Sequence, residues 1–430
     1  MIASLIGFGI LFLLAFAGVP LAFAMLIVGT VGFALLRGSF ESAYSMLAQQ
    51  VVDASANDGM AVLPMFILMG LFVHKSDLSE ELYKAANAWL GHLRGGLAHA
   101  TVAACAIFAA ISGSSIATAA TMSKVAIPPM RRLGYHDALS CGSVASAGVL
   151  GVLIPPSVPL VVYGLLTNTD IRQLFIAAIV PGLMLALLFV IAVVGVVTLR
   201  PEWGPTGEHK SWQERFTSLK SVWMVLVLFV AIIGGLYAGI FTATESAGIG
   251  ASGALLIGVL RRKMTWSILF ECLKDTARTT AMIFTIVFGA FVFANFITLS
   301  GLTAALIDML QQQNMGTLGL LLMMMVIYLV LGALMESLSL LILTAPIFHA
   351  IATSVGIHPI WFGIFVVMMI EIGLLTPPVG MNVFTVKTMN PDVPIRTIFK
   401  GSMPFVAANM VGVGVFIAFP IIGVFLLRWF

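Results

Sequence analysis

The chain contains 430 residues, of which 60% are hydrophobic and only 9% are charged, and its formal net charge is +3. A soluble domain carries roughly 25% charged residues, so this composition excludes a soluble fold and predicts an all-α polytopic protein embedded in a lipid bilayer. The small net charge gives no indication of nucleic-acid binding. Three widely separated cysteines indicate neither a disulfide framework nor a metal site.

The N-terminal region, residues 1–96, is predicted to supply scaffold helices and an interfacial arm. Residues 1–36 stay apolar and lack the basic start of a signal peptide, so we expect one long or bent span with a kink at Gly18-Val19-Pro20. Residues 60–74 are predicted to span the membrane again. In residues 78–90, charged and apolar side chains alternate at helical spacing, which indicates a helix lying in the membrane interface.

Residues 97–200 are predicted to form the first of two transport repeats. Two apolar pieces of about 15 residues, each short for a span of about 20, are separated by Ser112-Gly113-Ser114-Ser115, so we expect a re-entrant hairpin over 97–131. Residues 137–167 would form one membrane helix, but Pro155-Pro156 removes two backbone donors and breaks it. Broken backbone at membrane depth is tolerated only inside protein or along a water-filled cavity.

The second half of the chain follows the same plan after a polar loop at 201–220. Residues 221–315 are predicted to add scaffold helices and a second interfacial arm, at 264–276. Residues 316–430 are predicted to form the second transport repeat. Its hairpin and its broken helix are expected at 316–354 and 359–389.

The two repeats align on one offset of 222 residues. Ser115 lies 40 residues before Pro155, and Ser337 lies 40 residues before Pro377. Basic residues cluster in segments that the positive-inside rule places in the cytoplasm, and a cytoplasmic N-terminus satisfies all of these clusters. The first hairpin then opens from the cytoplasm and the second from the outside. The repeats are therefore predicted to be inverted, as in many secondary transporters.

Each pair of hairpin tip and helix break offers hydroxyl and carbonyl oxygens beside a helix N-terminus. Such oxygens are hard ligands suited to an alkali cation, and the unpaired N–H groups of a helix N-terminus suit a carboxylate. We therefore predict two sodium sites flanking an anion site near the membrane midplane. The predicted sodium ligands are Ser112, Gly113, Ser115, Gly151, Pro155, Ser337, Gly373, Thr376 and Gly380. The predicted substrate-binding residues are Ser114, Ser157, Glu336, Ser339 and Asn382.

A structural role is the open alternative for each of these residues. A lone Ser or Thr in a membrane helix usually bonds to its own helix, and a lone Gly usually serves packing. Charged residues inside apolar segments are functional candidates by default; these are Glu336, Glu371, Lys124 and Lys387. Asp170 and Asp392 lie in turns after the breaks, where we expect them to cap helices, and Glu245 at a helix start has either role.

The sequence carries no signal of an enzyme. It lacks both the Gly-x-x-x-x-Gly-Lys-Ser/Thr loop that binds ATP phosphates and the His-Glu-x-x-His zinc motif. The seven histidines are scattered, which disfavours a haem or a metal site. We expect no cofactor, with sodium as the coupling ion.

The chain resembles the large membrane subunit of the tripartite ATP-independent periplasmic (TRAP) transporters, the DctM/SiaM-like family. The resemblance covers essentially the whole chain and includes the Gly-Ser-Ser hairpin. It rests further on three stretches: Leu-Ile-Pro-Pro-Ser at 153–157, Thr-Ala-Thr-Glu-Ser-Ala at 242–247 and Leu-Thr-Pro-Pro-Val-Gly-Met-Asn at 375–382.

The resemblance implies a multi-pass protein of the bacterial inner membrane that works by an elevator mechanism. It implies sodium-coupled uptake of an organic acid anion, such as a C4-dicarboxylate or sialic acid. The partners it implies are a small four-helix membrane subunit and a periplasmic substrate-binding protein. Two alternatives stay open: a single-component sodium/dicarboxylate symporter of the same superfold, and a membrane enzyme or structural subunit without transport activity.

Overall fold

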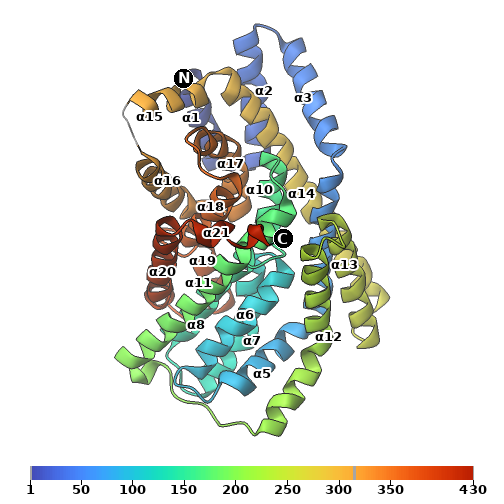
Figure 1. Ribbon diagram of the computed structural model, residues 1–430, viewed down its shortest axis with the longest axis vertical. Helices are drawn as coiled ribbons and strands as arrows, with labels where there is room; N and C mark the ends of the chain where they lie inside the picture. Colours follow the sequence, from blue (N-terminus) through green and yellow to red (C-terminus); the bar gives the residue numbers. More distant parts are fainter. Residues whose placement is uncertain (1, 313–315, 430) are drawn as a thin grey trace.

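The structure is a computed structural model that describes residues 2–312 and 316–429, and these residues form helices joined by turns and loops (Figure 1). Seven helices in this part of the chain are long and apolar enough to cross a membrane, or eight if a bent pair around Pro155-Pro156 is one span. The prediction of an all-α polytopic membrane protein is confirmed. The predicted boundary at 315 falls outside the described residues.

We refer to the helices that begin each half of the chain as the scaffold. In the first half they are α1 (Ile2–Phe16), α2 (Leu21–Arg37), α3 (Phe40–Ser55), the 3-10 turn η1 (Asp58–Ala61), α4 (Val62–Lys75) and α5 (Leu78–Leu90). In the second half they are α12 (Trp212–Tyr237), α13 (Ala243–Leu260), α14 (Trp266–Leu299) and α15 (Leu302–Gln312). The two halves interlock, because α14 packs along α2 and α13 packs along α4.

The remaining helices form what we call the transport block. Its first half contains α6 (Gly96–Ser112), α7 (Ser115–Arg132), α8 (Asp137–Ala147), α9 (Leu150–Leu153), α10 (Val158–Thr167), α11 (Ile171–Leu199) and the turn η2 (Pro201–Trp203). Its second half contains α16 (Thr317–Gly332), α17 (Ser337–Ser354), α18 (Pro359–Gly373), α19 (Met381–Met389), α20 (Ile395–Ala418), α21 (Ile421–Val424) and η3 (Leu426–Arg428). The pairs α6–α7 and α16–α17 are the expected hairpins, and α8–α10 and α18–α19 are the expected broken helices.

Helix boundaries repeat at the spacing found in the sequence. Adding 222 to the bounds of α7 gives 337 and 354, which are the bounds of α17. The same shift carries α2 to 243–259, and α13 spans Ala243–Leu260. The correspondence therefore reaches from the transport block into the scaffold. The inverted orientation of the two repeats stays a prediction.

The N-terminal region differs from the expected single span. The helices α1 and α2 have 15 and 17 residues and pack against each other, with Gly7 beside Val28. Gly18 lies in the connecting turn at φ +90°, a conformation that glycine adopts at no steric cost. The Gly-Val-Pro stretch therefore reverses the chain rather than kinking one helix.

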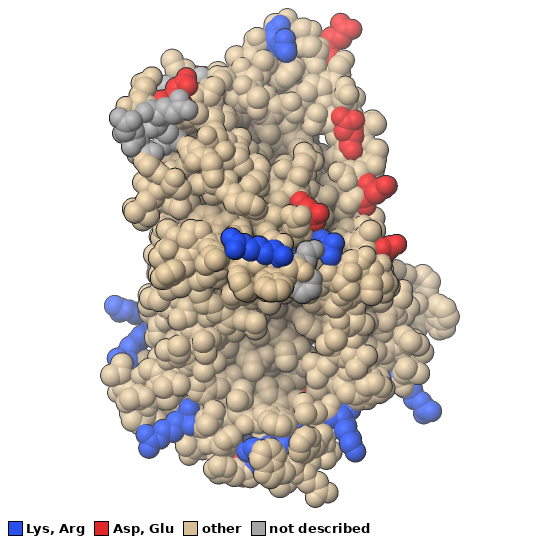
Figure 2. All heavy atoms as spheres, in the orientation of Figure 1, with Lys and Arg blue, Asp and Glu red and all other residues tan. Residues whose placement is uncertain are grey.

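This reversal also overturns the expected cytoplasmic N-terminus. Ser4 hydrogen-bonds Ser300, which follows the C-terminal end of α14, whereas the basic residues 261–263 precede its N-terminal end. Lys and Arg gather at the lower end of the molecule in Figure 2, and the N-terminus lies at the top of Figure 1. The positive-inside rule then places the start of α1 on the extracytoplasmic side.

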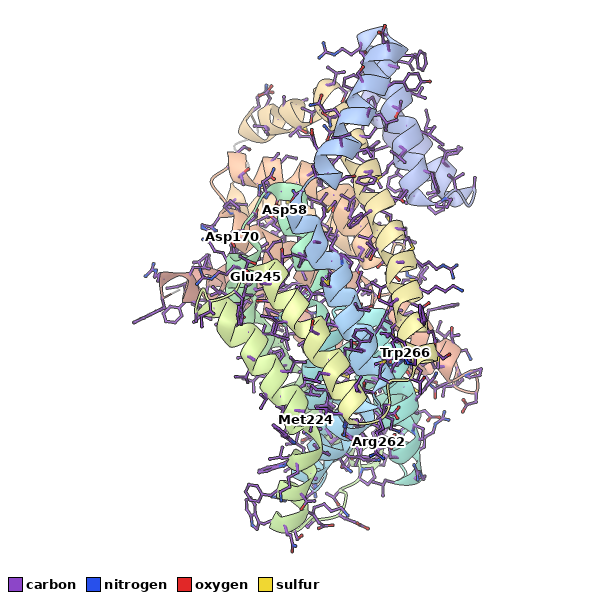
Figure 3. All side chains as sticks on the ribbon, turned by 90° about the vertical axis from the view of Figure 1, so that its right-hand side faces the viewer. Asp58, Asp170, Met224, Glu245, Arg262 and Trp266 are labelled. Carbon is purple, nitrogen blue, oxygen red and sulfur yellow. The ribbon has the colours of Figure 1, made fainter. Side chains whose placement is uncertain are left out.

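The two ends of the helix bundle differ in the sign of their charge. Figure 3 shows Asp58 and Glu245, which precede α4 and lie at the start of α13, together with Asp170 above Arg262 and Trp266. Basic and tryptophan residues are typical of the cytoplasmic side and the membrane interface, respectively. The side of the bundle on which the three acidic residues lie is therefore the extracytoplasmic one.

Two scaffold helices differ from the prediction: α12 begins earlier than expected, and α14 continues through a predicted break. The predicted loop 201–220 ends early, because Ser211 and Glu214 form a capping box that starts α12. The predicted separate arm at 264–276 is the first part of α14, which is continuous. No proline interrupts residues 266–299, so nothing in this stretch forces the helix to break.

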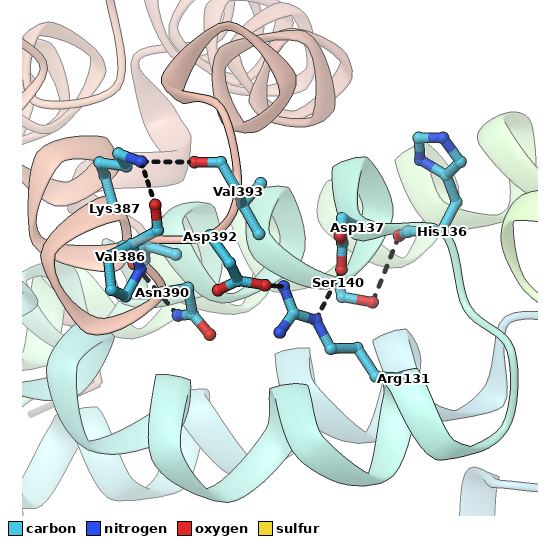
Figure 4. A network of polar contacts seen from close by, with 10 residues as sticks. Arg131, His136, Asp137, Ser140, Val386, Lys387, Asn390, Asp392 and Val393 are labelled. Carbon is cyan, nitrogen blue, oxygen red and sulfur yellow. Dashed lines mark hydrogen bonds and ion pairs between the residues drawn. The ribbon is translucent and has the colours of Figure 1, made fainter.

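A polar network joins the two halves of the transport block at the cytoplasmic end (Figure 4). Arg131 donates from Nε to Asp137 Oδ1 at 2.7 Å, and its Nη2 lies 2.7 Å from Asp392 Oδ2. The hydrogen bond from Arg131 lowers the pKa of Asp392, because a neighbouring positive charge favours the carboxylate. Lys387 donates to two carbonyl oxygens of the following loop, at 2.7 and 2.9 Å. Asp392 is thus an ion-pair partner of Arg131, and the expectation that it caps a helix is wrong.

Two connections between the scaffold and the transport block run side by side. The segment between α5 and α6 and the loop after η2 are linked by two backbone hydrogen bonds. These run from Gly95 N to Gly204 O and from Gly207 N to Gly91 O, each 3.0 Å long. A Cβ at Gly207 would lie 2.6 Å from the Gly91 carbonyl oxygen, so this close pairing requires glycine.

The two halves of the block also touch backbone to backbone where α8 meets α20. A Cβ at Gly142 would overlap the backbone of Gly401, and a Cβ at Gly401 would overlap the carbonyl group of Ala138. Small residues permit such close approach of membrane helices.

Gly401→Ala is therefore expected to force α20 away from α8 and to destabilise the protein. Overpacking costs about 1–3 kcal/mol, and here the obstacle is backbone that cannot rotate aside. Gly414→Ala on the same helix is the matched control, because nothing lies within 4 Å of a Cβ there. Thermal unfolding of the two detergent-purified variants measures the difference, and equal melting temperatures would contradict the assigned contact.

Candidate functional site

The tips of the two hairpins, residues 112–115 (tip 1) and 336–339 (tip 2), meet at one cavity of about 400 Å³. Its volume falls within the range of roughly 300–1,000 Å³ typical of small-molecule sites. Residues of α6, α7 and α9, the start of α10 and the scaffold helices α4 and α14 complete its wall. The tip residues that line it are Ser112, Gly113, Ser114, Glu336, Ser337 and Leu338.

Tip 1 presents the N-terminus of α7 to this cavity without a charged cap. Gly113 has φ +62°, a conformation that turns the chain between the two half-helices. Ser114 is the N-cap, and its hydroxyl accepts a hydrogen bond from Ala117 N at 3.3 Å. The hydroxyls of Ser112 and Thr118 are 2.8 Å apart and bonded to each other. The helix end therefore keeps its partial positive charge.

Tip 2 differs because a carboxylate caps its helix. Glu336 accepts hydrogen bonds from the backbone N–H groups of Leu338 and Ser339, both at 3.1 Å, and from the Ser337 hydroxyl at 3.2 Å. Both carboxylate oxygens are thus engaged within the tip. Glu336 and Ser339 were predicted to bind substrate; the structure gives Glu336 a capping role at the cavity wall, and Ser339 donates its backbone N–H to that cap.

Tip 1 lies directly against the break of its own repeat. A Cβ on Gly148 would come within 2.9 Å of the Ser115 carbonyl oxygen, and a Cβ on Gly113 within 3.0 Å of Val158 Cγ2. The Ser115 hydroxyl is buried and has no hydrogen-bond partner among the described residues. Buried hydroxyls normally have a partner, so this oxygen is free to serve as a ligand.

The first break itself is closed and buried. Gly151 and Pro155 are both buried, and Ile154 ends the helix in an extended conformation. Ser157 caps α10, donating its hydroxyl to the carbonyl of Val152 and accepting from a backbone N–H at 3.4 Å. Ser157 is not among the described residues that line the cavity, although it was predicted to bind substrate.

In the second half the C-terminal end of α16, which leads into tip 2, lies against the second break. A Cβ on Gly373 would come within 2.5 Å of Gly332 Cα, and the N–H of Gly380 points to the carbonyl oxygen of Ala333 at 3.4 Å. The Thr376 hydroxyl is shared between two carbonyl oxygens of the preceding turn, at 2.9 and 3.0 Å. In both repeats the break therefore packs against the hairpin, at the tip in the first repeat and at the end of α16 in the second. Sodium binding by these residues stays a prediction.

Asn382 lies away from the cavity, between the two halves of the transport block. It is fully buried, and its Nδ2 donates to the carbonyl oxygen of Ala145 on α8 at 3.2 Å. Its Oδ1 has no partner in the described part of the chain. It is not among the described lining residues of the cavity, so its predicted contact with substrate has no support from the geometry.

Three polar residues that the sequence did not single out also line the cavity. They are His74 on α4, Thr121 on α7 and Thr279 on α14. His74 Nδ1 lies 3.3 Å from Thr121 Oγ1, which places this part of the cavity near the cytoplasmic end of α4. An ionisable residue at the end of an apolar segment is a signal that could have identified His74, whereas a single threonine carries none.

A larger hollow of about 850 Å³ lies between α16, α18 and α20. Residues such as Leu321 and Trp361 give it a mostly apolar wall, and it contains none of the predicted site residues. Ligand sites need a few convergent polar groups. The cavity between the tips therefore remains the candidate site.

Two of the remaining acidic residues cap helices, which was predicted for Asp170 and was one of two alternatives for Glu245. Asp170 accepts a hydrogen bond from Gln173 N at 3.1 Å at the start of α11. Glu245 forms a capping box with Thr242 at the start of α13. Lys124 is exposed and is not among the described residues that line the cavity.

Two helical hairpins, two helices broken at Pro-Pro and a cavity between the hairpin tips form an arrangement typical of the permeases of secondary transporters. Comparison with known proteins agrees with this class. Residues 8–422 match the family model of the tripartite ATP-independent periplasmic transporter, DctM component. The chain belongs to this family, the large permease subunits of TRAP transporters.

Relatives of known name match nearly end to end. The sialic acid TRAP transporter large permease protein SiaM of Vibrio cholerae is 34% identical over 408 residues, which cover 95% of this chain and 94% of SiaM. The C4-dicarboxylate TRAP transporter large permease protein DctM of Pseudomonas aeruginosa is 35% identical over 384 residues, 89% of each chain. The solved Alcanivorax borkumensis YdaH transporter shares the fold, with a TM-score of 0.66 over 89% of this chain and 90% of that one, at 14% identity.

Family membership confirms the resemblance seen in the sequence. The relatives are transporter permease subunits, so the chain is a transport protein rather than an enzyme. Membership and the apolar helices together make it a multi-pass protein of the inner membrane.

Proposed function

We propose that the chain is the permease subunit through which a sodium gradient drives uptake of an organic acid anion, of the C4-dicarboxylate or sialic acid type. One observation carries the proposal: two hairpin tips from separate halves of the sequence converge on one cavity that the scaffold also lines. Relatives named for these two substrates are 34% and 35% identical to the chain.

Tip 1 is the end of the cavity that suits the carboxylate of the substrate. Its helix N-terminus is capped by the neutral Ser114, and the Ser112 hydroxyl lies beside it. At tip 2 the carboxylate of Glu336 already occupies the corresponding N-terminus. Anions are favoured at a free N-terminus and repelled by a second carboxylate, so the substrate anion binds at tip 1.

Sodium fits the hard oxygens that lie behind the tips. The buried Ser115 hydroxyl has no other partner among the described residues, and it lies beside a break where proline frees carbonyl oxygens. In the second half the Thr376 hydroxyl is engaged by its own helix. The second sodium site therefore depends on carbonyl oxygens around Gly373 and Gly380, and the two sites have unlike ligand sets.

The wall of the cavity is divided between the scaffold and the transport block, which is the arrangement that an elevator mechanism uses. The scaffold supplies α4 and α14, and the block supplies both tips and the start of α10. The halves of the block are held together by the Gly142–Gly401 contact and by the Arg131 network. The block can therefore move as one body past the scaffold.

Two partners complete the proposed transporter. They are a periplasmic substrate-binding protein, which delivers the anion, and a small four-helix membrane subunit. The description of the family as one component of a tripartite periplasmic transporter supports these partners. It favours them over the single-component sodium/dicarboxylate symporter that the sequence left open.

Reconstitution into liposomes tests the proposal. The chain is incorporated with its small membrane subunit, and uptake of labelled succinate and of labelled N-acetylneuraminate is measured with its substrate-binding protein outside. We expect uptake of one of these anions only with an inward sodium gradient and only with the binding protein. Potassium in place of sodium and empty liposomes are the controls. Equal uptake without sodium, or without the binding protein, would contradict the proposal.

A further inference from the structure

His74 on the scaffold helix α4 lines the cavity between the tips, and the proposed function gives it no role. The described lining residues of α4 are Ile67, Gly70, Leu71 and His74, which a spacing of three and four residues places on one face of the helix. Among these four, only His74 has a side chain that can form a hydrogen bond. It is exposed although it lines the cavity, so its role depends on what the imidazole contacts.

The imidazole contacts both helices of the first hairpin. Its Nδ1 is bonded to Thr121 Oγ1 on α7 at 3.3 Å, and the centre of its ring lies 6.4 Å from that of Phe108 on α6. In the described part of the chain, the Thr121 hydroxyl makes no bond to its own helix, whereas the nearby Ser123 donates to the Ala119 carbonyl at 2.7 Å. Hydroxyls inside a helix commonly bond back to its carbonyl groups, so Thr121 is directed toward the scaffold instead.

The end of α4 that carries His74 is fixed within the scaffold. Lys75, the next residue, forms an ion pair with Glu271 on α14 at 2.6 Å, and both α13 and α14 pack along α4. The imidazole is thus held by the scaffold, whereas Thr121 belongs to the transport block. The hydrogen bond between them joins the two bodies.

This contact lies on the cytoplasmic side of the tips. Ala117, Ala120 and Thr121 line the cavity along α7, which runs from tip 1 toward the cytoplasmic end of the block. At 1.5 Å per residue, Thr121 lies about 9 Å along the helix from Ser115. The cavity therefore extends from the tips toward the cytoplasm, and the bond is made while the candidate site faces that side.

We propose that His74 is a positioning residue for transport, which holds the first hairpin against the scaffold through Thr121 while the site faces the cytoplasm. The inference rests on the proposed movement of the block past the scaffold. Thr121 moves with the block and His74 does not, so the bond opens each time the block crosses the membrane. An interaction made in one of two positions stabilises that position alone. His74 therefore sets the balance between the two positions without binding sodium.

A cysteine introduced into the cavity measures this balance in membranes that contain the assembled transporter. Ala117 lines the cavity and is exposed, and the three natural cysteines are buried, so Ala117→Cys is the reporter. A membrane-impermeant maleimide labels it from outside in spheroplasts and from the cytoplasmic side in inverted vesicles. In de-energised membranes, with choline in place of sodium, the ratio of the outer to the inner labelling rate follows the ratio of the two populations.

In the reporter protein, His74→Leu and Thr121→Val should each raise the ratio of outer to inner labelling about two- to tenfold, which is the effect of one lost hydrogen bond. Both changes remove the same bond, so the double variant should shift the ratio no further than either single variant.

Conservative variants separate this role from a general structural one. His74→Asn places an amide group where Nδ1 now lies, and Thr121→Ser keeps the hydroxyl, so both should retain the labelling ratio of the reporter protein. Thr198→Val is the matched control for Thr121→Val, because the exposed Thr198 hydroxyl bonds to its own helix at 2.7 Å. It should leave the ratio unchanged.

An unchanged ratio in both His74→Leu and Thr121→Val would overturn the inference, and so would shifts that multiply in the double variant. If His74→Leu does not yield folded protein, Thr121→Val and Thr121→Ser decide. A reporter that is labelled from both sides at a ratio insensitive to these variants refutes only the role of His74. A reporter labelled from one side only, in a protein that also lacks sodium-driven uptake, refutes the movement of the block and the inference with it.

Discussion

Ser114→Asp is expected to abolish uptake of the organic acid anion while leaving the fold intact. Aspartate is as good an N-cap as serine, so α7 keeps the hydrogen bond that Ser114 now accepts from Ala117 N. The new carboxylate, however, occupies the place where the proposed substrate anion binds. Two like charges about 4 Å apart repel by roughly 4 kcal/mol at an effective dielectric constant near 20, which corresponds to a loss of about 1,000-fold.

Ser114→Asn is the matched control for this change. Asparagine caps a helix as well as aspartate does and is uncharged, so this variant should retain most of the uptake. Initial rates in proteoliposomes, with melting temperatures of the same preparations, measure both effects. Equal rates for the aspartate and asparagine variants would show that the anion does not bind at tip 1.

Gly113→Val should also reduce uptake strongly, by on the order of 100-fold, because displacing a binding site by about 1 Å can have that effect. Gly113 has φ +62°, where a β-branched residue is a genuine outlier. A Cβ there would also lie 3.0 Å from Val158 Cγ2 and 3.4 Å from Val158 N. Tip 1 must therefore move away from α10, and the cavity changes shape.

Gly134→Val is the control that distinguishes the effect of backbone strain from the effect of a steric clash with a neighbouring helix. Gly134 has φ +79°, but nothing lies within 4 Å of a Cβ at that position. This variant carries the same kind of strain without a displaced tip, so it should lose stability and keep its uptake. If both variants reduced uptake equally in amounts of folded protein matched by size-exclusion chromatography, the contact of tip 1 with α10 would not explain the effect.

The sequence allowed the hairpins and broken helices to be predicted because their signals are local and occur twice. Pro155-Pro156 and Pro377-Pro378 break any helix that contains them, and the constant spacing to Ser115 and Ser337 revealed the repeat. The observed bounds of α7 and α17 keep this spacing. A helix break that follows from the backbone chemistry of proline can be predicted from the sequence without knowing which helices are in contact.

The N-terminal hairpin could not be predicted in the same way. Gly18 and Pro20 are compatible with either a kink or a full reversal, and the choice depends on how α1 packs against α2. At 1.5 Å per residue, helices of 15 and 17 residues are shorter than the apolar core, about 30 Å thick. In the sequence, the two short helices together therefore resemble one long membrane span. Repetition at the offset of 222 would have identified the hairpin, since α13 follows α12 as α2 follows α1.

The site was predictable only as far as the tips and breaks themselves. The roles of Thr376 and Ser115 differ because one hydroxyl is bonded to its own helix and the other has no partner among the described residues. The type of a residue does not determine which hydrogen bonds its hydroxyl makes, so this difference could not be predicted from the sequence. His74 reaches the cavity from the scaffold, and such a contact between distant segments requires the folded structure.

The paired glycine connections at the cytoplasmic end restrict how the transport block can travel. Gly95 bonds to Gly204 and Gly207 bonds to Gly91, so the chain enters and leaves the first half of the block through one shared pivot. In the proposed elevator movement this shared connection is expected to act as a pivot for the first half of the block. Displacement should therefore be smallest beside these glycines and largest at the far, extracytoplasmic side, where α15 precedes the second hairpin.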